Sequence, residues 1–313
     1  MKIDFIAGHD LQAQCGESVF TELEKLGHEC KWHINPGQDL DAEAIVMLDH
    51  APHHPKLKAK YKFYLSHDMG DLSVYHNESW YLREYDAIFT PTNKHAVYAQ
   101  QWMPWCEVEY IGWTKYDIIK PLDISLDNEI VFIYAPTNPR SYEWKKVFEW
   151  FKDSDAGLII KNHLLLNPGQ KAPLGYEQQY KMHFKSRDEM EAAAAGMKNT
   201  IVLSHDINLC DTFKQGRILI SDQSSALVEF TPFGVSLETG RYDESDNILP
   251  ENSKNWSGIY FVCDAELKAT IQNPEIARQK ISCHAIGGDV EFRQDNGKRI
   301  AEYMHKYFRR VKK

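Results

Sequence analysis

The chain has 313 residues, with 45 Asp and Glu against 36 Lys and Arg, and a formal net charge of −9. This acidic balance argues against duplex-nucleic-acid binding through a broad basic surface, but it leaves room for a local pocket that binds a small anion. The six cysteines are scattered and lack C-x-x-C or zinc spacing, as is typical of a reduced, cytoplasmic protein. No signal peptide or apolar run of membrane-spanning length is evident, so membrane contact is expected to be peripheral at most.

The first part of the chain alternates short apolar runs with amphipathic stretches. The apolar runs predict strands at 3–7, 30–34, 44–48, 61–66, 87–89 and 108–111. The amphipathic stretches predict helices at 17–26 and 94–102. A polar segment at 120–128 is interpreted as a linker, so we expect a first, acceptor-side domain over residues 1–122.

The same alternation restarts after the linker and predicts a second, donor-binding domain over residues 123–313. Strands are expected at 129–134, 157–160, 201–203, 217–221, 235–238 and 259–262. Helices are expected at 142–151, 188–197, 208–214, 226–230, 274–286 and 290–308, the last being a candidate to pack back on the first domain. The predicted fold class is α/β, with two Rossmann-like domains whose mostly parallel sheets face a cleft.

The strand predicted at 217–221 ends close to two adjacent hydroxyls, Ser224 and Ser225, which precede a helical pattern. The first N–H groups of a helix are unpaired and lie at the positive end of its dipole, so this junction is a candidate diphosphate site. The alternative is a serine N-cap with no ligand. Asp222 is assigned to the nucleotide, and Glu229, four residues after Ser225, to a ribose hydroxyl.

Other polar residues follow the ends of predicted strands, where parallel sheets bind ligands. His67 is the candidate general base, and His9 is a second candidate. Thr137 and Arg140 offer a hydroxyl and a guanidinium to phosphate. Lys161 and His163 would share one face of a strand and meet an anion together. Each residue also has a structural alternative, as a loop histidine, a turn or a strand end.

Two segments that suggest a metal are interpreted as metal-free. His50, His53 and His54 lack a spaced carboxylate or cysteine, and prolines place them in a loop. Asp153-Ser154-Asp155 matches a D-x-D pattern but lies between a helix and a strand, so a turn is predicted. Aromatic residues near His67 could stack on a sugar or base, or belong to the core: Tyr64, Tyr75, Trp80 and Tyr81. The basic tail at 305–313 could touch an anionic membrane face or end in solvent.

Five ordered segments resemble motifs of the CDP-glycerol glycerophosphotransferase family, the wall teichoic acid primases and polymerases. The family motifs are His-Gly, Gly-x-x-Lys/Arg-x-Asp, Tyr-Ala-Pro-Thr-Trp, Lys-x-His-Pro and Asp-Tyr-Ser-Ser. The matching segments are Leu65-Ser-His-Asp-Met-Gly70, Tyr110-Ile-Gly-Trp-Thr-Lys-Tyr-Asp117, Ile133-Tyr-Ala-Pro-Thr137, Ile160-Lys-Asn-His163 and Ile220-Ser-Asp-Gln-Ser-Ser225. Their shared order makes them more specific together than singly.

The resemblance implies a glycosyltransferase-B fold and transfer from a nucleotide-diphospho donor, with no obligatory metal or other cofactor. It makes His67 the base, and His163 a residue that binds or protonates the donor phosphates. Ser224 and Ser225 would hold the diphosphate, while Arg140 and Lys161 add positive charge. The departures put the donor in question: Asp68 replaces Gly, Pro is missing after His163, Gln223 replaces Tyr, and Asn138-Pro139 interrupts the third motif.

The first functional hypothesis is a cytoplasmic transferase that moves glycerol phosphate, or a related polyol phosphate, from a CDP-linked donor. The acceptor would be a glycan, a polyol or a lipid-linked molecule, with peripheral contact at the inner membrane face as an option. The second is a glycosyltransferase of the same fold that uses a UDP-, GDP- or CMP-linked sugar in surface polysaccharide or other glycan synthesis. The third is a nucleotide-binding module without catalysis.

Overall fold

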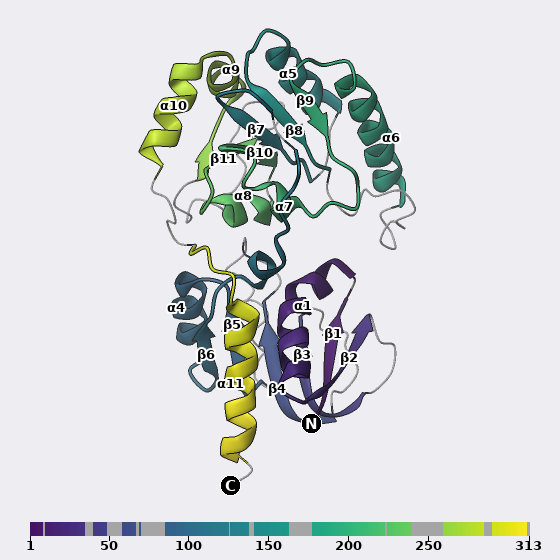
Figure 1. Ribbon diagram of the computed structural model, residues 1–313, viewed down its shortest axis with the longest axis vertical. Coiled ribbons are helices and arrows are strands. Elements are labelled where there is room, and N and C mark those ends of the chain that lie inside the picture. The colour runs from purple at the N-terminus through teal and green to yellow at the C-terminus, as the bar shows by residue number, and fades with distance from the viewer. Residues whose placement is uncertain are drawn as a thin grey trace. The chain divides into compact units, whose positions relative to one another are not determined.

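The computed structural model describes residues 1–8, 10–34, 40–48, 58–66, 69, 85–124, 126–137, 141–162, 177–222, 224–239, 259–284 and 290–311. The chain divides into two compact units (Figure 1). Unit 1 comprises Met1–Ile119 and Asp289–Lys313, and unit 2 comprises Lys120–Gly288. The C-terminal segment therefore belongs to the same unit as the N-terminus, although the whole of unit 2 separates them in sequence.

Unit 1 contains a six-stranded parallel sheet in the order β2-β1-β3-β4-β5-β6. Its strands are β1 (Lys2–Ala7), β2 (Glu29–Ile34), β3 (Asp41–Met47), β4 (Lys58–Leu65), β5 (Ala87–Thr90) and β6 (Glu107–Tyr110). The helices are α1 (Asp10–Lys25), α4 (Asn93–Trp102), the 3-10 helix η1 (Thr114–Ile118) and α11 (Asn296–Val311). The helix predicted at 17–26 thus begins seven residues earlier.

Neighbouring residues of β4 show how the sheet is covered on both faces. Phe63 packs its ring against Tyr307 and Phe308 of α11. Tyr64 points to the opposite face, as alternation along a strand requires, and lies in the core that includes Ala99 of α4. Tyr64 is fully buried, so of the two expectations for this residue the core position is the one that the structure supports.

Unit 2 also contains a six-stranded parallel sheet, in the order β12-β11-β10-β7-β8-β9. Its strands are β7 (Val131–Tyr134), β8 (Gly157–Ile160), β9 (Thr200–Val202), β10 (Ile218–Asp222), β11 (Val235–Thr239) and β12 (Ile259–Phe261). The helices are α5 (Ser141–Lys152), α6 (Glu177–Ala194), α7 (Leu209–Thr212), α8 (Ser225–Phe230), α9 (Asp264–Gln272) and α10 (Pro274–Cys283). The central strands read as continuous apolar runs because helices cover both of their faces.

The structure corrects the bounds of three predicted helices. The helix predicted at 188–197 is α6, which begins eleven residues earlier in a polar stretch that carries no strong apolar period. The helix predicted at 274–286 ends at Cys283. The helix predicted at 290–308 begins only at Asn296, because a carboxylate from elsewhere in unit 1 caps it there. No described helix is both long and apolar enough to cross a membrane.

Candidate functional site

The strand order of unit 2 places a topological switch point between β7 and β10. The chain starts the sheet with β7, continues outward through β8 and β9, and then returns to place β10 on the other side of β7. The connections that leave the two central strands therefore run to opposite faces of the sheet. In open parallel sheets this divergence opens a crevice at the carboxyl ends of the strands, where ligands bind.

Hydrogen bonds tie the two carboxyl ends together at this switch point. The Thr137 N–H, three residues after β7, donates to Oδ1 of Asp222 at 2.6 Å. The Ser221 hydroxyl donates to the Ala135 carbonyl, also at 2.6 Å. Asp222 was predicted to contact the nucleotide; its carboxylate orients the loop that follows β7, and the nucleotide contact stays a prediction.

Ser224 caps α8 as the serine N-cap alternative anticipated. Its hydroxyl accepts a hydrogen bond from the Ala226 N–H at 3.2 Å, and its backbone is extended. The Ser236 hydroxyl of β11 donates to the Leu227 carbonyl, which fastens the short helix to the sheet. A Cβ at Gly234 would lie 2.2 Å from the Arg217 carbonyl oxygen, so the turn from α8 to β11 requires glycine. An N-cap at Ser224 is compatible with a bound phosphate, because the cap satisfies only one of the several unpaired N–H groups at the start of the helix.

Ser225 and Glu229 face each other one turn apart on α8, as their spacing predicted. The Ser225 hydroxyl lies 3.4 Å from Oε1 of Glu229, and the Cys210 thiol lies 3.4 Å from Oε2. Glu229 is only 3% exposed. In this structure the carboxylate therefore orients Ser225 from within the core, while its contact with a ribose stays a prediction.

Thr137 carries a polar atom that the described residues leave unsatisfied. Its Oγ1 is buried and has no hydrogen-bond partner within the part of the chain that the structure describes. A buried hydroxyl without a partner costs about 1–3 kcal/mol, and it is retained where a ligand or water completes it. Thr137 is thus a candidate to bond a phosphate oxygen at the switch point.

Lys161 follows β8 and is almost fully buried, at 1% exposure. Its Nζ donates to the carbonyls of Asn162 at 3.1 Å and His205 at 3.5 Å. Burial lowers the pKa of Lys161 from 10.5 to about 8, although the nearby charges of Glu191 and Asp206 act in the opposite direction. The cation lies beneath the carboxyl edge of the sheet, and its predicted contact with donor phosphates stays a prediction.

Sequence reasoning missed the polar network around Lys161. The Asn162 amide donates to Oε1 of Glu191 on α6 at 2.6 Å, and Nε2 of His205 lies 3.6 Å from the same oxygen. Asn162 is buried, and its Oδ1 has no partner among the described residues. These residues come from three segments that only the folded sheet brings together. The one sequence signal was the position of Asn162 directly after an apolar strand.

Several predicted site residues lie outside the described residues: His9, His67, Arg140 and His163. The same holds for the proposed stacking residues Tyr75, Trp80 and Tyr81, for the histidines at 50, 53 and 54, and for Gln223. Their roles stay predictions. The segment at 153–155 forms the predicted turn between α5 and β8.

The segment that resembles the Gly-x-x-Lys/Arg-x-Asp motif has a structural role in unit 1. The Asp117 carboxylate accepts from the N–H groups of Asn296 at 3.1 Å and Gly297 at 2.6 Å, and so caps α11. Gly112 has φ +116°, and a Cβ there would lie 2.2 Å from Oδ1 of Asn296. These two motif residues therefore hold the N-terminus of α11 against unit 1.

The architecture is that of the glycosyltransferase-B class, with two Rossmann-like units, each built on a six-stranded parallel sheet. The predicted α/β fold class is confirmed, whereas the cleft stays a prediction. No protein-family model and no curated protein sequence matches the chain.

Solved structures are similar to the chain over nearly its whole length. One is the MnaA–UDP co-structure from S. aureus, with TM-score 0.61, 12% identity, and coverage of 98% of this chain and 97% of that one. Another is the wall teichoic acid polymerase TagF soaked with CDPG, with TM-score 0.62, 14% identity, and coverage of 100% and 89%. A third is Acinetobacter baumannii MurG, with TM-score 0.52, 10% identity, and coverage of 97% and 99%. At these identities the likeness establishes the fold.

Proposed function

We propose that the protein is a transferase that moves glycerol phosphate, or a related polyol phosphate, from a CDP-linked donor to a hydroxyl acceptor. The observation that carries this proposal is the switch point of unit 2. The Thr137 hydroxyl has no partner among the described residues, and the loop that contains it is hydrogen-bonded to Asp222. Asp222 in turn stands two residues before Ser224, which caps α8. This arrangement offers hydroxyl and N–H donors where parallel sheets bind nucleotides. The five motif-like segments and the fold shared with TagF, a polymerase whose crystals were soaked with CDPG, support the choice of donor.

In the proposed reaction the acceptor oxygen attacks the phosphorus that carries the glycerol. A new P–O bond forms to the acceptor, the P–O bond to the cytidylate breaks, and CMP leaves. His67 takes the proton from the acceptor hydroxyl. Thr137, Ser225 and Lys161 would stabilise the negative charge that grows on the departing phosphate, with Arg140 and His163 as further donors.

The altered motif positions favour one competing function, sugar transfer from a nucleotide sugar by a protein of the same fold. Asp68, Asn138-Pro139 and Gln223 replace residues that the resemblance associates with a glycerophosphate donor. The two reactions break different bonds of the donor. Attack at phosphorus releases CMP from CDP-glycerol. Attack at the sugar carbon releases a nucleoside diphosphate from a UDP- or GDP-sugar, and CMP from a CMP-sugar, so the donor that is consumed has to be identified together with the nucleotide released.

A donor panel separates the two functions. The full chain is first tested by thermal shift with CDP, CMP, UDP and GDP, and then incubated with CDP-glycerol or nucleotide sugars and a polyol acceptor. We expect stabilisation by cytidine nucleotides and release of CMP, both weakened by Thr137→Val. Turnover should disappear in a folded His67→Ala variant. Stabilisation by UDP or GDP alone would replace the first proposal with the second, and binding without turnover would indicate a nucleotide-binding module.

A further inference from the structure

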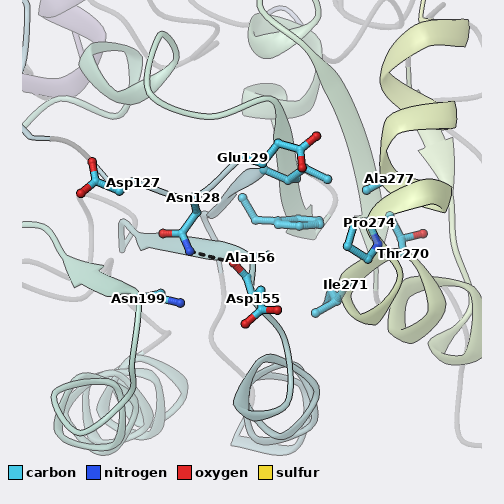
Figure 2. A pocket seen from close by; sticks show the side chains of 12 residues that line it. Asp127, Asn128, Glu129, Asp155, Ala156, Asn199, Thr270, Ile271, Pro274 and Ala277 are labelled. Carbon is cyan, nitrogen blue, oxygen red and sulfur yellow. Dashed lines mark hydrogen bonds between the residues drawn. The ribbon is translucent and has the colours of Figure 1, made fainter.

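A cavity in unit 2 lies at the opposite edge of the sheet from the switch point. It has a volume of about 310 Å³ and is bordered by residues that immediately precede β7, β8 and β9, together with residues of α9 and α10 (Figure 2). Parallel strands place their amino ends at one edge and their carboxyl ends at the other. The cavity is therefore separate from the candidate donor site, and none of its lining residues belongs to that site.

Bonds between different elements hold the walls of this cavity. The Asn128 side chain donates to the Asp155 carbonyl at 2.7 Å, which joins the segments that precede β7 and β8. Arg278 of α10 forms a two-pronged ion pair with Glu129, at 2.6 and 2.7 Å. The Ser154 hydroxyl donates to the Ile271 carbonyl at 2.8 Å, which ties the end of α9 to the α5–β8 turn. Contacts from three directions make the cavity a built feature of the fold.

The floor of the cavity is apolar and its mouth is acidic. Ile130, Phe132 and Ile271 are buried core side chains that line it. Asp127 and Asp155 are exposed at the mouth, and neither carboxylate has an ion-pair partner among the residues that the structure describes. Figure 2 shows Asp155 beside Ala156 and Ile271, whereas Asp127 lies beyond Asn128 with its carboxylate directed away from the apolar side chains.

Helix ends of both signs meet at this cavity. The last turn of α9 contributes Thr270 and Ile271 to the wall, and Asp155 follows the end of α5 by three residues. The first turn of α10 contributes Pro274 and Ala277. Carboxyl ends of helices favour cations and amino ends favour anions, so the net negative charge at the cavity comes from the carboxylates.

We propose that this cavity binds a small organic cation with an apolar body, such as an aralkyl or alkyl ammonium. The floor would bury the apolar body, Asp155 would pair with the ammonium group at the mouth, and Asp127 would add negative potential from farther away. A metal ion fits less well, because no group of three or more His, Cys, Asp or Glu side chains among the described residues could hold one. The volume suits on the order of ten non-hydrogen atoms, at about 30 Å³ each.

Three matched probes of this size test the proposal on the full chain. Phenethylammonium, 2-phenylethanol and phenylacetate share one aromatic body and differ in charge. We expect saturable binding of the ammonium, by calorimetry or ligand-observed NMR, at a Kd of roughly 10 mM or tighter. We expect 2-phenylethanol to bind on the order of five- to tenfold more weakly than phenethylammonium, and phenylacetate not to bind. Added salt should weaken the binding of phenethylammonium.

Variants then locate the site. Asp155→Asn should weaken phenethylammonium binding several-fold and Asp127→Asn by less, whereas Asp153→Asn, an exposed neighbour that does not line the cavity, should leave it unchanged. Ala156→Phe should fill the cavity and abolish binding of both the ammonium and the alcohol, while thermal unfolding confirms that each variant is folded. Equal binding of the alcohol and the ammonium, binding indifferent to Asp127 and Asp155, or no saturable binding would each overturn the proposal.

Discussion

The buried ammonium of Lys161 predicts a stability cost that disappears at high pH. Burial lowers its pKa from 10.5 to about 8, and the group is 1% exposed. A difference of about 2.5 between the unfolded and folded pKa values corresponds to about 3 kcal/mol, at 1.36 kcal/mol per unit. Below pH 8 both states are protonated and the full cost applies. Between pH 8 and 10.5 the unfolded state binds more protons than the folded state, so stability rises with pH.

The variant Lys161→Met removes this titration and keeps much of the side-chain volume. We compare the free energy of unfolding of the variant with that of the unaltered protein. The difference, variant minus unaltered, should fall by about 3 kcal/mol from pH 7.5 to pH 10.5, because the unaltered protein gains stability over that range and the variant does not. Urea titrations of the full chain, with the unfolding of unit 2 followed by hydrogen exchange of its backbone amides, measure this difference. Other groups that titrate at high pH cancel in the comparison.

A matched control is Lys152→Met, since Lys152 is exposed and ion-paired with Glu149 on the surface of α5. Its effect should stay within about 0.5 kcal/mol and vary little with pH. The reasoning is refuted if the difference in free energy of unfolding between Lys161→Met and the unaltered protein does not change with pH, or increases with it. If Lys161 also serves the donor, activity should be lost in Lys161→Met at every pH, even where the variant is the more stable protein.

Three further results are expected. Gly112→Ala should destabilise unit 1 by about 2 kcal/mol or more, because its φ is +116° and a Cβ would meet Asn296. The control Gly27→Ala, with φ +82° and open space around it, should cost only about 1 kcal/mol. Equal costs for the two variants in denaturant titrations would contradict this prediction. Ser224→Ala should cost about 1 kcal/mol in thermal or urea unfolding through the lost cap of α8, and no loss would mean that the cap contributes nothing. Unit 1 should lose up to about 5 kcal/mol of stability as pH falls from 6.5 towards 3. Burial lowers the pKa of His95 to about 3, so the unfolded protein takes up a proton on this side chain at a higher pH than the folded protein does. His95→Gln should flatten this pH dependence, and an unchanged slope of stability against pH would refute the prediction.

Most of the strands of both sheets could be predicted from the sequence, because central parallel strands are buried on both faces and appear as short apolar runs. β7, β8 and β10 are examples, with every residue of β7 and β8 buried. Local chemistry also offered Ser224 as an N-cap and placed Glu229 on the same side of α8 as Ser225, since both inferences depend on residues within one helical turn. The start of α6 was missed because its first turns are polar and lack the apolar period that marks amphipathic helices.

What only the tertiary structure decided involves residues that are far apart in the chain. The start of α11 at Asn296 depends on the Asp117 carboxylate, 179 positions earlier. The orientation of the Lys161 side chain depends on a carbonyl from His205 and on charges from α6, and the acidic cavity requires three strand beginnings and two helices to meet. A local pattern records what each residue prefers within a few neighbours, whereas burial and long-range pairing arise only when the sheet has assembled.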